Sequence, residues 1–248
     1  MTEERLGLVR QALDTIENKD IKEFAIVLLE DLPEYIWHVG ASSTGKYHPT
    51  YSLGEMGLMR HQVAVVRFLN FFFELEQYNS KLTSREMDLM RVCGLVHDGR
   101  KSGSQEDFEK SKYTKFDHPL QMAEVIRSYD GQYLSHDEIE LIATTISSHM
   151  GAWNEDKKSS IILPKPSNKF QRMLHVADYL ASRKCLTMDF EGYEAAKQEL
   201  PDIGSYKLTF GRYTGKTLLE VNEIAPDYIA WAKENITREP IKSLLKQL

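Results

Sequence analysis

Histidines and aspartates spread along the middle of the chain constrain its fold more than any other feature. They are His61, the adjacent pair His97-Asp98, His118, His149 and Asp178. Imidazole and carboxylate ligands together suit Zn, Mn, Fe or Ni. The pair His97-Asp98 ends an apolar run that begins at Leu89. A carboxylate in such a place is costly unless it is paired or bound to metal. The chain is therefore expected to fold so that these side chains meet around metal.

Each member of this set also has a less specific interpretation. A single histidine on an apolar helix is more often a buried, hydrogen-bonded core residue than a metal ligand. His61, however, precedes an apolar stretch, and Asp178 lies inside another, between Val176-Ala177 and Leu180-Ala181. Several such placements in one chain favour a metal site over coincidence.

The bulk composition is that of an ordinary globular protein. With 248 residues the chain can form one large domain, or one domain with a small appendage. Its longest apolar stretch, Val63 to Phe73, is interrupted by Arg67 and Asn70, and is too short and too polar to span a bilayer. The N-terminus lacks the basic start and apolar core of a signal peptide. We therefore expect a cytoplasmic protein that does not contact a membrane.

The chain has two cysteines, Cys93 and Cys185. Both lie in apolar sequence that is expected to be helical. This context predicts buried free thiols rather than a disulfide or a metal clip.

Charge is distributed unevenly. The formal net charge is −6, which argues against broad electrostatic binding to nucleic acid. Residues 207–248 nevertheless carry seven Lys and Arg against five Asp and Glu. The tail can therefore touch a polyanion, although so small an excess of positive charge is a weak signal.

The spacing of apolar residues predicts helices through most of the chain. We expect them at about 4–18, 20–31, 57–76, 85–97, from 118 onward, 135–148 and 168–186. Ser84 is expected to cap the helix at 85–97, and Ser135 with Glu138 forms a capping box. Loops are expected over 38–57, 99–117 and 151–167. Since no strand pattern appears before residue 205, the core is predicted to be all-α.

The C-terminal part has a different pattern. Residues 208–218 carry glycines at turn positions, which predicts a hairpin. Two short helices are expected after it, at about 226–235 and 238–247. The chain is thus predicted to be mainly α, with an all-helical domain over 1–200 and a small α+β module over 205–248.

The order of the histidines and aspartates resembles the HD superfamily of metal-dependent phosphohydrolases, over about residues 35–185. HD proteins place a His, then His-Asp, then a distant Asp around one metal. The resemblance implies that the ligands here are His61, His97, Asp98 and Asp178. His175 lies one turn before Asp178 on the same helix face, where it can support a ligand or be an ordinary core or surface residue.

Two-metal HD members carry two further histidines between the His-Asp pair and the last Asp. His118 and His149 fall there. The resemblance then implies that Asp98 bridges two ions. Several two-metal relatives have another His directly after the position of His149, where this chain has Met150.

Lys101 follows the His-Asp pair at an offset where many HD hydrolases carry a Lys that contacts phosphate. The alternative is a solvated lysine in a Lys- and Ser-rich loop. Arg100 can substitute for Lys101 in this contact.

The loop from Ala41 to Pro49 and the following segment Gly57-Leu58-Met59-Arg60-His61 are similar to HD-domain 3′-to-5′ exoribonucleases. Those enzymes have an Ala/Lys/His loop before a Gly-Leu-Leu-x-His segment. The resemblance implies that Lys46 and His48 contact substrate. Such exoribonucleases also carry an N-terminal OB-type module that this chain lacks the residues to build, so their activity on RNA does not simply carry over.

The C-terminal segment 210–221, followed by Asp227-Tyr228 and Trp231, resembles a small module found behind some DNA exonuclease domains, such as that of exodeoxyribonuclease X. The occurrence of this module beside DNA exonuclease domains suggests a nucleic-acid ligand. Arg212 and Lys216 can supply phosphate contacts, and Tyr213 and Trp231 can stack on bases. Alternatively, the aromatic residues simply form the core of the module.

Together these features predict metal-assisted hydrolysis of a phosphoester or phosphoanhydride. Two divalent ions are expected, with Asp98 orienting the hydroxide and Lys101 neutralising charge on the non-bridging oxygens. The expected substrate is a nucleotide or a nucleic-acid 3′ end. The alternatives are a small-molecule (d)NTP or cyclic-nucleotide phosphohydrolase, and a non-catalytic binding module that keeps a structural metal. No oligomeric state follows from the sequence.

Overall fold

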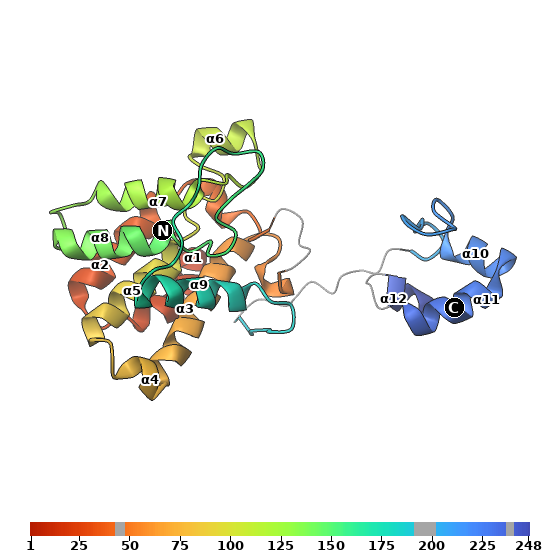
Figure 1. The fold of residues 1–248 in the computed structure, drawn as a ribbon, viewed down its shortest axis with the longest axis horizontal. Helices are drawn as coiled ribbons and strands as arrows, with labels where there is room; N and C mark the ends of the chain where they lie inside the picture. The colour runs from red at the N-terminus through yellow and green to blue at the C-terminus, as the bar shows by residue number, and fades with distance from the viewer. Residues whose placement is uncertain (43–47, 191–201, 237–240) are drawn as a thin grey trace. The chain divides into compact units, whose positions relative to one another are not determined.

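The structure is a computed structural model that describes residues 1–42, 48–190, 202–236 and 241–248. The chain divides into two compact units, Met1–Glu194 and Ala195–Leu248, and each is described by itself (Figure 1). The expected domain limits, 1–200 and 205–248, stay a prediction. Lys46 lies outside the described residues.

The larger unit is helical, which confirms the helical core expected from the sequence. Its α-helices are α1 (Glu3–Asp14), α2 (Lys19–Asp31), α3 (Gly57–Glu74), α4 (Glu76–Asn79), α5 (Ser84–Val96), α6 (Gln105–Lys110), α7 (His118–Arg127), α8 (His136–Ser147) and α9 (Lys169–Ala181). Two 3-10 helices, η1 (Glu34–Trp37) and η2 (Thr50–Ser52), precede α3. None of the described helices is long and apolar enough to cross a membrane.

Helix α3 lies at the centre of this unit and packs against α5 and α9 (Figure 1). Leu58, Val65 and Leu69 on α3 are completely buried. A close approach of α5 is possible because Gly94 has no side chain; a Cβ there would lie 2.9 Å from Cγ2 of Val66. This packing brings the end of α5 beside the start of α3.

Arg60 fixes the segment that leads into α3. Its buried guanidinium donates from Nη2 to the carbonyl oxygens of Leu53, at 3.0 Å, and Glu55, at 2.7 Å. The hydroxyl of Tyr51 in the same segment donates to the carbonyl of Ala181, at 3.0 Å, where α9 ends. The segment 50–56 therefore ties together the two helices that carry His61 and Asp178.

Capping residues account for two differences from the sequence prediction. The expected loop 99–117 contains α6, whose start is stabilised by a capping box between Ser104 and Asp107. The N-cap of α5 is Thr83 rather than Ser84, since Thr83 forms a capping box with Glu86. The predicted capping box of Ser135 and Glu138 is confirmed at the start of α8.

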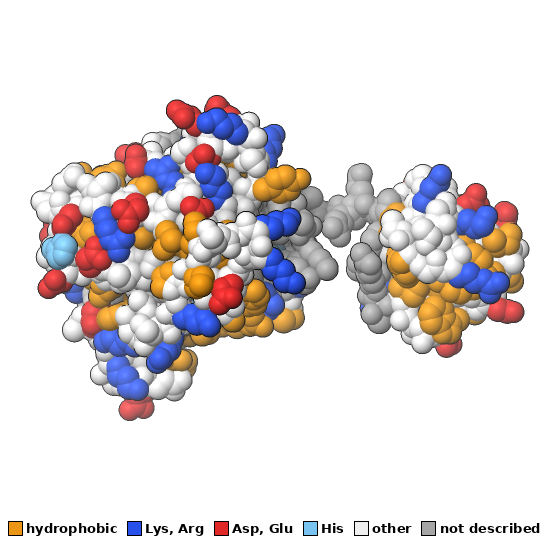
Figure 2. All heavy atoms as spheres, turned by 45° about the horizontal axis from the view of Figure 1, so that its top comes forward, with side chains coloured by type: hydrophobic (Ala, Val, Ile, Leu, Met, Phe, Trp, Pro, Cys, Tyr) orange, Lys and Arg blue, Asp and Glu red, His pale blue; other side chains and the backbone are white. Residues whose placement is uncertain are grey.

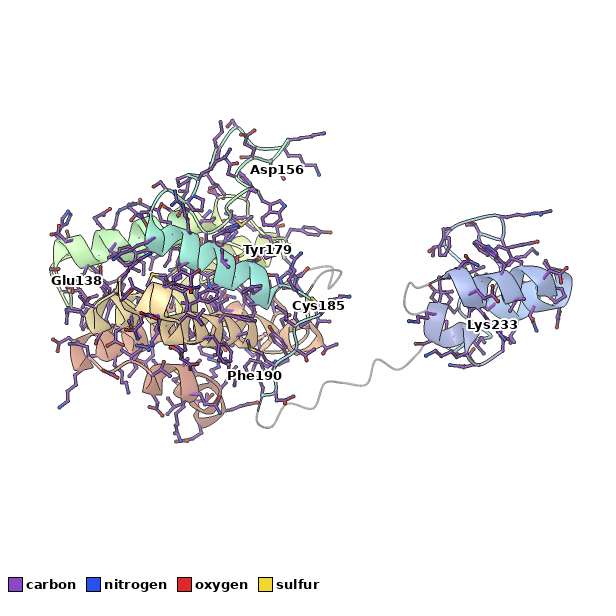
Figure 3. All side chains as sticks on the ribbon, turned by 60° about the horizontal axis from the view of Figure 1, so that its bottom comes forward. Glu138, Asp156, Tyr179, Cys185, Phe190 and Lys233 are labelled. Atoms are coloured by element: carbon purple, nitrogen blue, oxygen red, sulfur yellow. The ribbon has the colours of Figure 1, made fainter. Side chains whose placement is uncertain are left out.

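The two cysteines have different environments. Cys93 on α5 is buried, as expected. Cys185 is exposed, because α9 ends at Ala181 instead of running to 186 (Figure 3). The prediction of a buried thiol is therefore wrong for Cys185.

The smaller unit contains α10 (Leu218–Ile224), α11 (Pro226–Asn235) and α12 (Ile241–Leu245) around its own small apolar core. Sequence reasoning missed α10, which begins at a capping box of Thr217 and Glu220. Among the described residues the expected hairpin is represented by one isolated bridge, Lys207 with Thr217, so an α+β character is not shown. Figure 2 shows hydrophobic side chains gathered on one face of this unit.

Candidate metal centre

The larger unit brings all six predicted ligands together. His61 comes from α3, His97 and Asp98 from the end of α5, His118 from the start of α7, His149 from the turn after α8, and Asp178 from α9. All except Asp178 are at most 1% exposed, and the Asp178 side chain is 20% exposed. Segments far apart in the sequence thus meet at one buried point.

The carboxylate of Asp98 lies between two groups of histidines. Its Oδ1 is 2.9 Å from Nε2 of His118 and 3.5 Å from Nε2 of His149. Its Oδ2 is 3.7 Å from Nε2 of His97. On the far side, Oδ1 of Asp178 lies 3.0 Å from Nε2 of His61 and 3.7 Å from Nε2 of His97. Asp98 therefore belongs both to a group with His61 and His97 and to a group with His118 and His149.

Backbone hydrogen bonds fix three of the imidazole rings. In each of them Nδ1 lies beside the carbonyl oxygen of the residue three positions earlier, at 3.0 Å for His97, 2.6 Å for His118 and 2.8 Å for His149. A ring that donates from Nδ1 to a carbonyl presents a bare Nε2 lone pair on its other side. All three Nε2 atoms therefore face the centre as acceptors.

Acceptors so close together repel one another unless a cation lies among them. Nε2 of His118 and Nε2 of His149 are 3.3 Å apart. Burial lowers the pKa of His118 to about 4, so His118 is a neutral ring at neutral pH. Nε2 of His97 and Oδ1 of Asp98 are buried without a hydrogen-bond partner. Ligands about 2.1 Å from one ion lie about 3.0–3.4 Å from each other, so these donors fit divalent metal.

Both aspartates are ionised in spite of their burial. Burial raises the pKa of Asp98, but the Lys101 ammonium and His97 outweigh it and hold that pKa well below its usual value. Nζ of Lys101 lies 2.6 Å from Oδ2 of Asp98. For Asp178, burial is likewise outweighed by His61, whose Nε2 lies 3.0 Å from Oδ1, and by the nearby His97, which together hold the pKa of Asp178 well below its usual value. The centre thus offers two carboxylates together with imidazole rings, a set that attracts cations.

His175 holds the turn that carries His149. Its Nδ1 donates to the carbonyl oxygen of His149 at 2.8 Å. The turn continues through Gly151 at φ +58°, and a Cβ there would lie 2.1 Å from Cε1 of His175. Glycine is required because both the backbone angle and the close ring exclude a side chain. His175 therefore supports a candidate ligand. Of the two interpretations made from the sequence, this is the more specific one.

A cavity of about 460 Å³ opens beside the centre. Its lining consists of His48, Lys101, His149, Met150, Trp153, His175, Asp178, Tyr179, Ser182 and Arg183. Two of the predicted substrate-binding residues, His48 and Lys101, are thus at the site. Arg100 is not among the described residues of this lining, and its Nη2 lies 3.9 Å from Oδ2 of Asp31.

His48 lies between the centre and the end of α9. Its Nε2 is 3.4 Å from Oγ of Ser182, and its ring centroid is 5.6 Å from that of His61. Burial, followed by the nearby His61, lowers the pKa of His48 to about 4. It can contact a substrate as a neutral ring rather than as a cation.

Sequence reasoning missed Trp153, Tyr179 and Arg183 as cavity residues. The available signal was their position, because Trp153 follows His149 by four residues and Tyr179 follows Asp178 directly. The turn after α8 and helix α9 each supply a candidate ligand and also part of the cavity wall.

The comparisons with known proteins agree with this geometry. A family model described as HD domain matches residues 59–183, about half of the chain, and one described as Exodeoxyribonuclease X-like C-terminal matches residues 208–237. The chain therefore belongs to the HD-domain family. HD domains are metal-dependent phosphohydrolases as a class, which supports a metal-dependent hydrolase in general. No curated protein and no solved structure matches the chain.

Proposed function

We propose that the chain is a metal-dependent phosphohydrolase that cleaves phosphoester bonds of nucleotides or nucleic-acid 3′ ends. The observation that carries the proposal is the position of Asp98, whose two oxygens face different histidine groups beside a cavity. A shared carboxylate suits two ions that act on one phosphoryl group. Mn, Fe, Ni and Zn fit the imidazole and carboxylate donors. A cytoplasmic location is part of this proposal.

We assign the ligands by their grouping. One ion would be held by His61, His97 and Asp98, joined by Asp178, whose Oδ1 lies 3.0 Å from Nε2 of His61, and the second by Asp98, His118 and His149. When bound, such ions lower the pKa of water and supply a hydroxide nucleophile near neutral pH. Asp98 orients that nucleophile, while the backbone-bonded rings keep the donors in place.

Lys101 is proposed to bind the phosphate. Its ammonium has three donors, and one of them is used by Asp98 at 2.6 Å. The others are available to non-bridging oxygens in the cavity that Lys101 lines, where they neutralise charge that develops during the reaction. His48 contacts the substrate on the side of α9.

Two observations bear on the substrate. The match to the Exodeoxyribonuclease X-like C-terminal family favours nucleic acid, with Arg212 and Lys216 as phosphate contacts. The cavity of about 460 Å³ falls within the range of about 300–1,000 Å³ of small-molecule sites. That size favours the second candidate, hydrolysis of (d)NTPs or cyclic nucleotides. A purely structural metal is less well supported, because structural sites are closed whereas this centre adjoins a cavity.

The test combines elemental analysis of the purified protein with a Mn²⁺ activity screen over dNTPs, cyclic dinucleotides and short RNA and DNA. We expect bound transition metal and turnover of at least one class. Lys101→Ala should lower kcat by about 10²–10³-fold without removing metal, and the exposed Lys157→Ala serves as the control. Full metal occupancy with no turnover of any class would leave the non-catalytic binding module as the better assignment.

A further inference from the structure

Two aromatic side chains in the cavity lining have no role in the core. The rings of Trp153 and Tyr179 stack with centroids 5.9 Å apart and planes inclined by 14°. Trp153 is 53% exposed and Tyr179 is 39% exposed. Neither belongs to the apolar core of the larger unit. Tyr179 lies on the solvent side of α9 (Figure 3), so the pair presents a flat apolar surface to whatever enters the cavity.

The position of this pair is fixed by the same backbone that fixes the candidate ligands. The amide of Trp153 donates to the carbonyl of Met150 at 3.1 Å, in the turn that follows His149. That turn is pressed onto His175, whose ring centroid lies 6.1 Å from that of Trp153. Tyr179 is the next residue after Asp178. The aromatic pair is therefore held at a set place beside the centre.

Positive charge accompanies the aromatic surface. The guanidinium carbon of Arg183 lies 4.2 Å from the centroid of the Tyr179 ring, and its Nε donates to the carbonyl of Tyr179 at 3.2 Å. Within the described part of the chain, no carboxylate forms an ion pair with Arg183. Lys101 supplies a second cation in the same cavity. One cavity thus offers flat aromatic rings together with two cations.

We infer that Trp153 and Tyr179 form a subsite that stacks on the nucleobase of the substrate, with the phosphate at the Asp98–Lys101 end of the cavity. This inference rests on the proposed function and specifies the substrate as one that carries a base next to the scissile phosphate. A nucleotide combines a planar aromatic group and an anion in one molecule, which matches the two parts of the lining. Because every base has a π-face, stacking discriminates little between bases.

The experiment compares two ligands that share a phosphate and differ in the base. AMP and ribose 5-phosphate are titrated into the full-length, metal-loaded protein by calorimetry, and AMP is checked for integrity afterwards. Stacking on an aromatic side chain corresponds to about 5- to 150-fold in affinity for one base. We expect Trp153→Ala to weaken AMP by a factor in that range and to leave ribose 5-phosphate unchanged. Trp153→Phe, which keeps a ring, should retain most of the AMP affinity.

Phe71→Ala is the matched control, since Phe71 is an aromatic residue of the same unit that is 56% exposed and does not line the cavity. It should leave both affinities unchanged. Equal effects of Trp153→Ala on both ligands, or no effect on AMP, would overturn the inference. An aromatic side chain of a partner protein would then be the better occupant.

The outcomes also separate this inference from the proposed function. If AMP binding depends on Trp153 but no phosphate substrate is hydrolysed, the base subsite stands and the hydrolase proposal fails. If nucleotides are hydrolysed while Trp153→Ala retains full AMP affinity, the hydrolase proposal stands and the base subsite fails.

Discussion

The two units use charged and aromatic side chains in opposite ways. The larger unit buries Asp98 and four histidines to at most 1% exposure. In the described part of the smaller unit, the buried side chains are apolar except for Thr217, and Trp231 is 51% exposed. Burying charge is costly unless it is compensated; in the larger unit the Lys101 ammonium compensates Asp98, and the His and Asp groups could hold a metal ion. The smaller unit has no such need, and any function it has must come from its surface.

The aromatic residues of the smaller unit divide between its core and its surface. Tyr213 and Tyr228 pack partly buried against its core, with ring centroids 4.8 Å apart. The ring centroid of Trp231 lies 5.5 Å from that of Tyr228, and Trp231 is the solvent-exposed end of this row of three aromatic residues. The guanidinium carbon of Arg212 lies 5.6 Å from the Tyr213 ring centroid. Part of the row is therefore core, and Trp231 is exposed to solvent.

The largest effect is expected at the buried charge. Asp98→Ala removes the carboxylate shared by both histidine groups, so it should strip metal and abolish hydrolysis, while the helical circular dichroism stays largely intact. We expect a loss of at least about 100-fold, more than the loss of an outer hydrogen bond to a ligand costs. Asp156→Ala, in an exposed loop of the same unit, is the control. Full metal occupancy in Asp98→Ala would refute the site assignment.

The next effect concerns the number of ions. His118 and His149 are surplus to a one-metal site, so we expect two ions about 3.5–4 Å apart. Replacing both residues by Ala should lower the stoichiometry from two ions toward one, as measured by elemental analysis. His136→Ala, whose side chain is 70% exposed and pairs with Asp130, should leave the stoichiometry unchanged. A single ion in the unaltered protein, with His118 turned to solvent, would contradict this prediction.

A smaller effect is expected for the C-terminal module. Deleting residues 205–248 should weaken oligonucleotide binding. Hydrolysis of bis-p-nitrophenyl phosphate should stay intact, because every proposed ligand precedes residue 180 and each unit has its own core. Salt should weaken oligonucleotide binding by the intact chain only slightly, because the module has few Lys and Arg side chains and can therefore neutralise few phosphates. In the full-length chain, Arg212→Ala with Lys216→Ala should reproduce part of the loss. If the truncated protein binds and cuts oligonucleotides equally well, a structural or partner-docking role is the better assignment.

The sequence predicted which helices carry the candidate ligands because the ends of regular helices are visible in it. Apolar spacing and capping residues located α3, α5, α8 and α9 to within a few residues, and the resemblance to the HD superfamily was confirmed by the family match. Short helices such as α6 and α10 were missed, since one or two turns carry too little periodicity to stand out from a loop.

The smallest effect is expected for charges at the surface of the larger unit. Arg85 Nε donates to Oε1 of Glu138, which is labelled in Figure 3. This hydrogen bond, with those from Ser135, lowers the pKa of Glu138 from 4.5 to about 2. A carboxyl group whose pKa is lower in the folded state than in the unfolded state stabilises the fold at pH values above its pKa in the unfolded state. This contribution is lost as the pH falls through its pKa in the folded state. Arg85→Ala should therefore cost at most about 1 kcal/mol at pH 7, and the difference should shrink between about pH 4.5 and 2. Urea unfolding at several pH values measures it. A difference in unfolding free energy between the two proteins that grows toward low pH would contradict the assigned hydrogen bond between Arg85 and Glu138.

The sequence by itself determined which residues can ligate a metal and which helices carry them, because both depend on residue type and local spacing. Only the tertiary structure decided what surrounds those ligands. It placed Arg100 near Asp31, put His175 on the backbone of His149, exposed Cys185, and stacked Trp153 on Tyr179. These contacts join side chains that lie far apart along the chain, or depend on where a helix ends. The contacts of His175 and Trp153 are set by how α9 packs beside α8, and the contact of Arg100 by how α2 packs on α5. No local pattern encodes that packing.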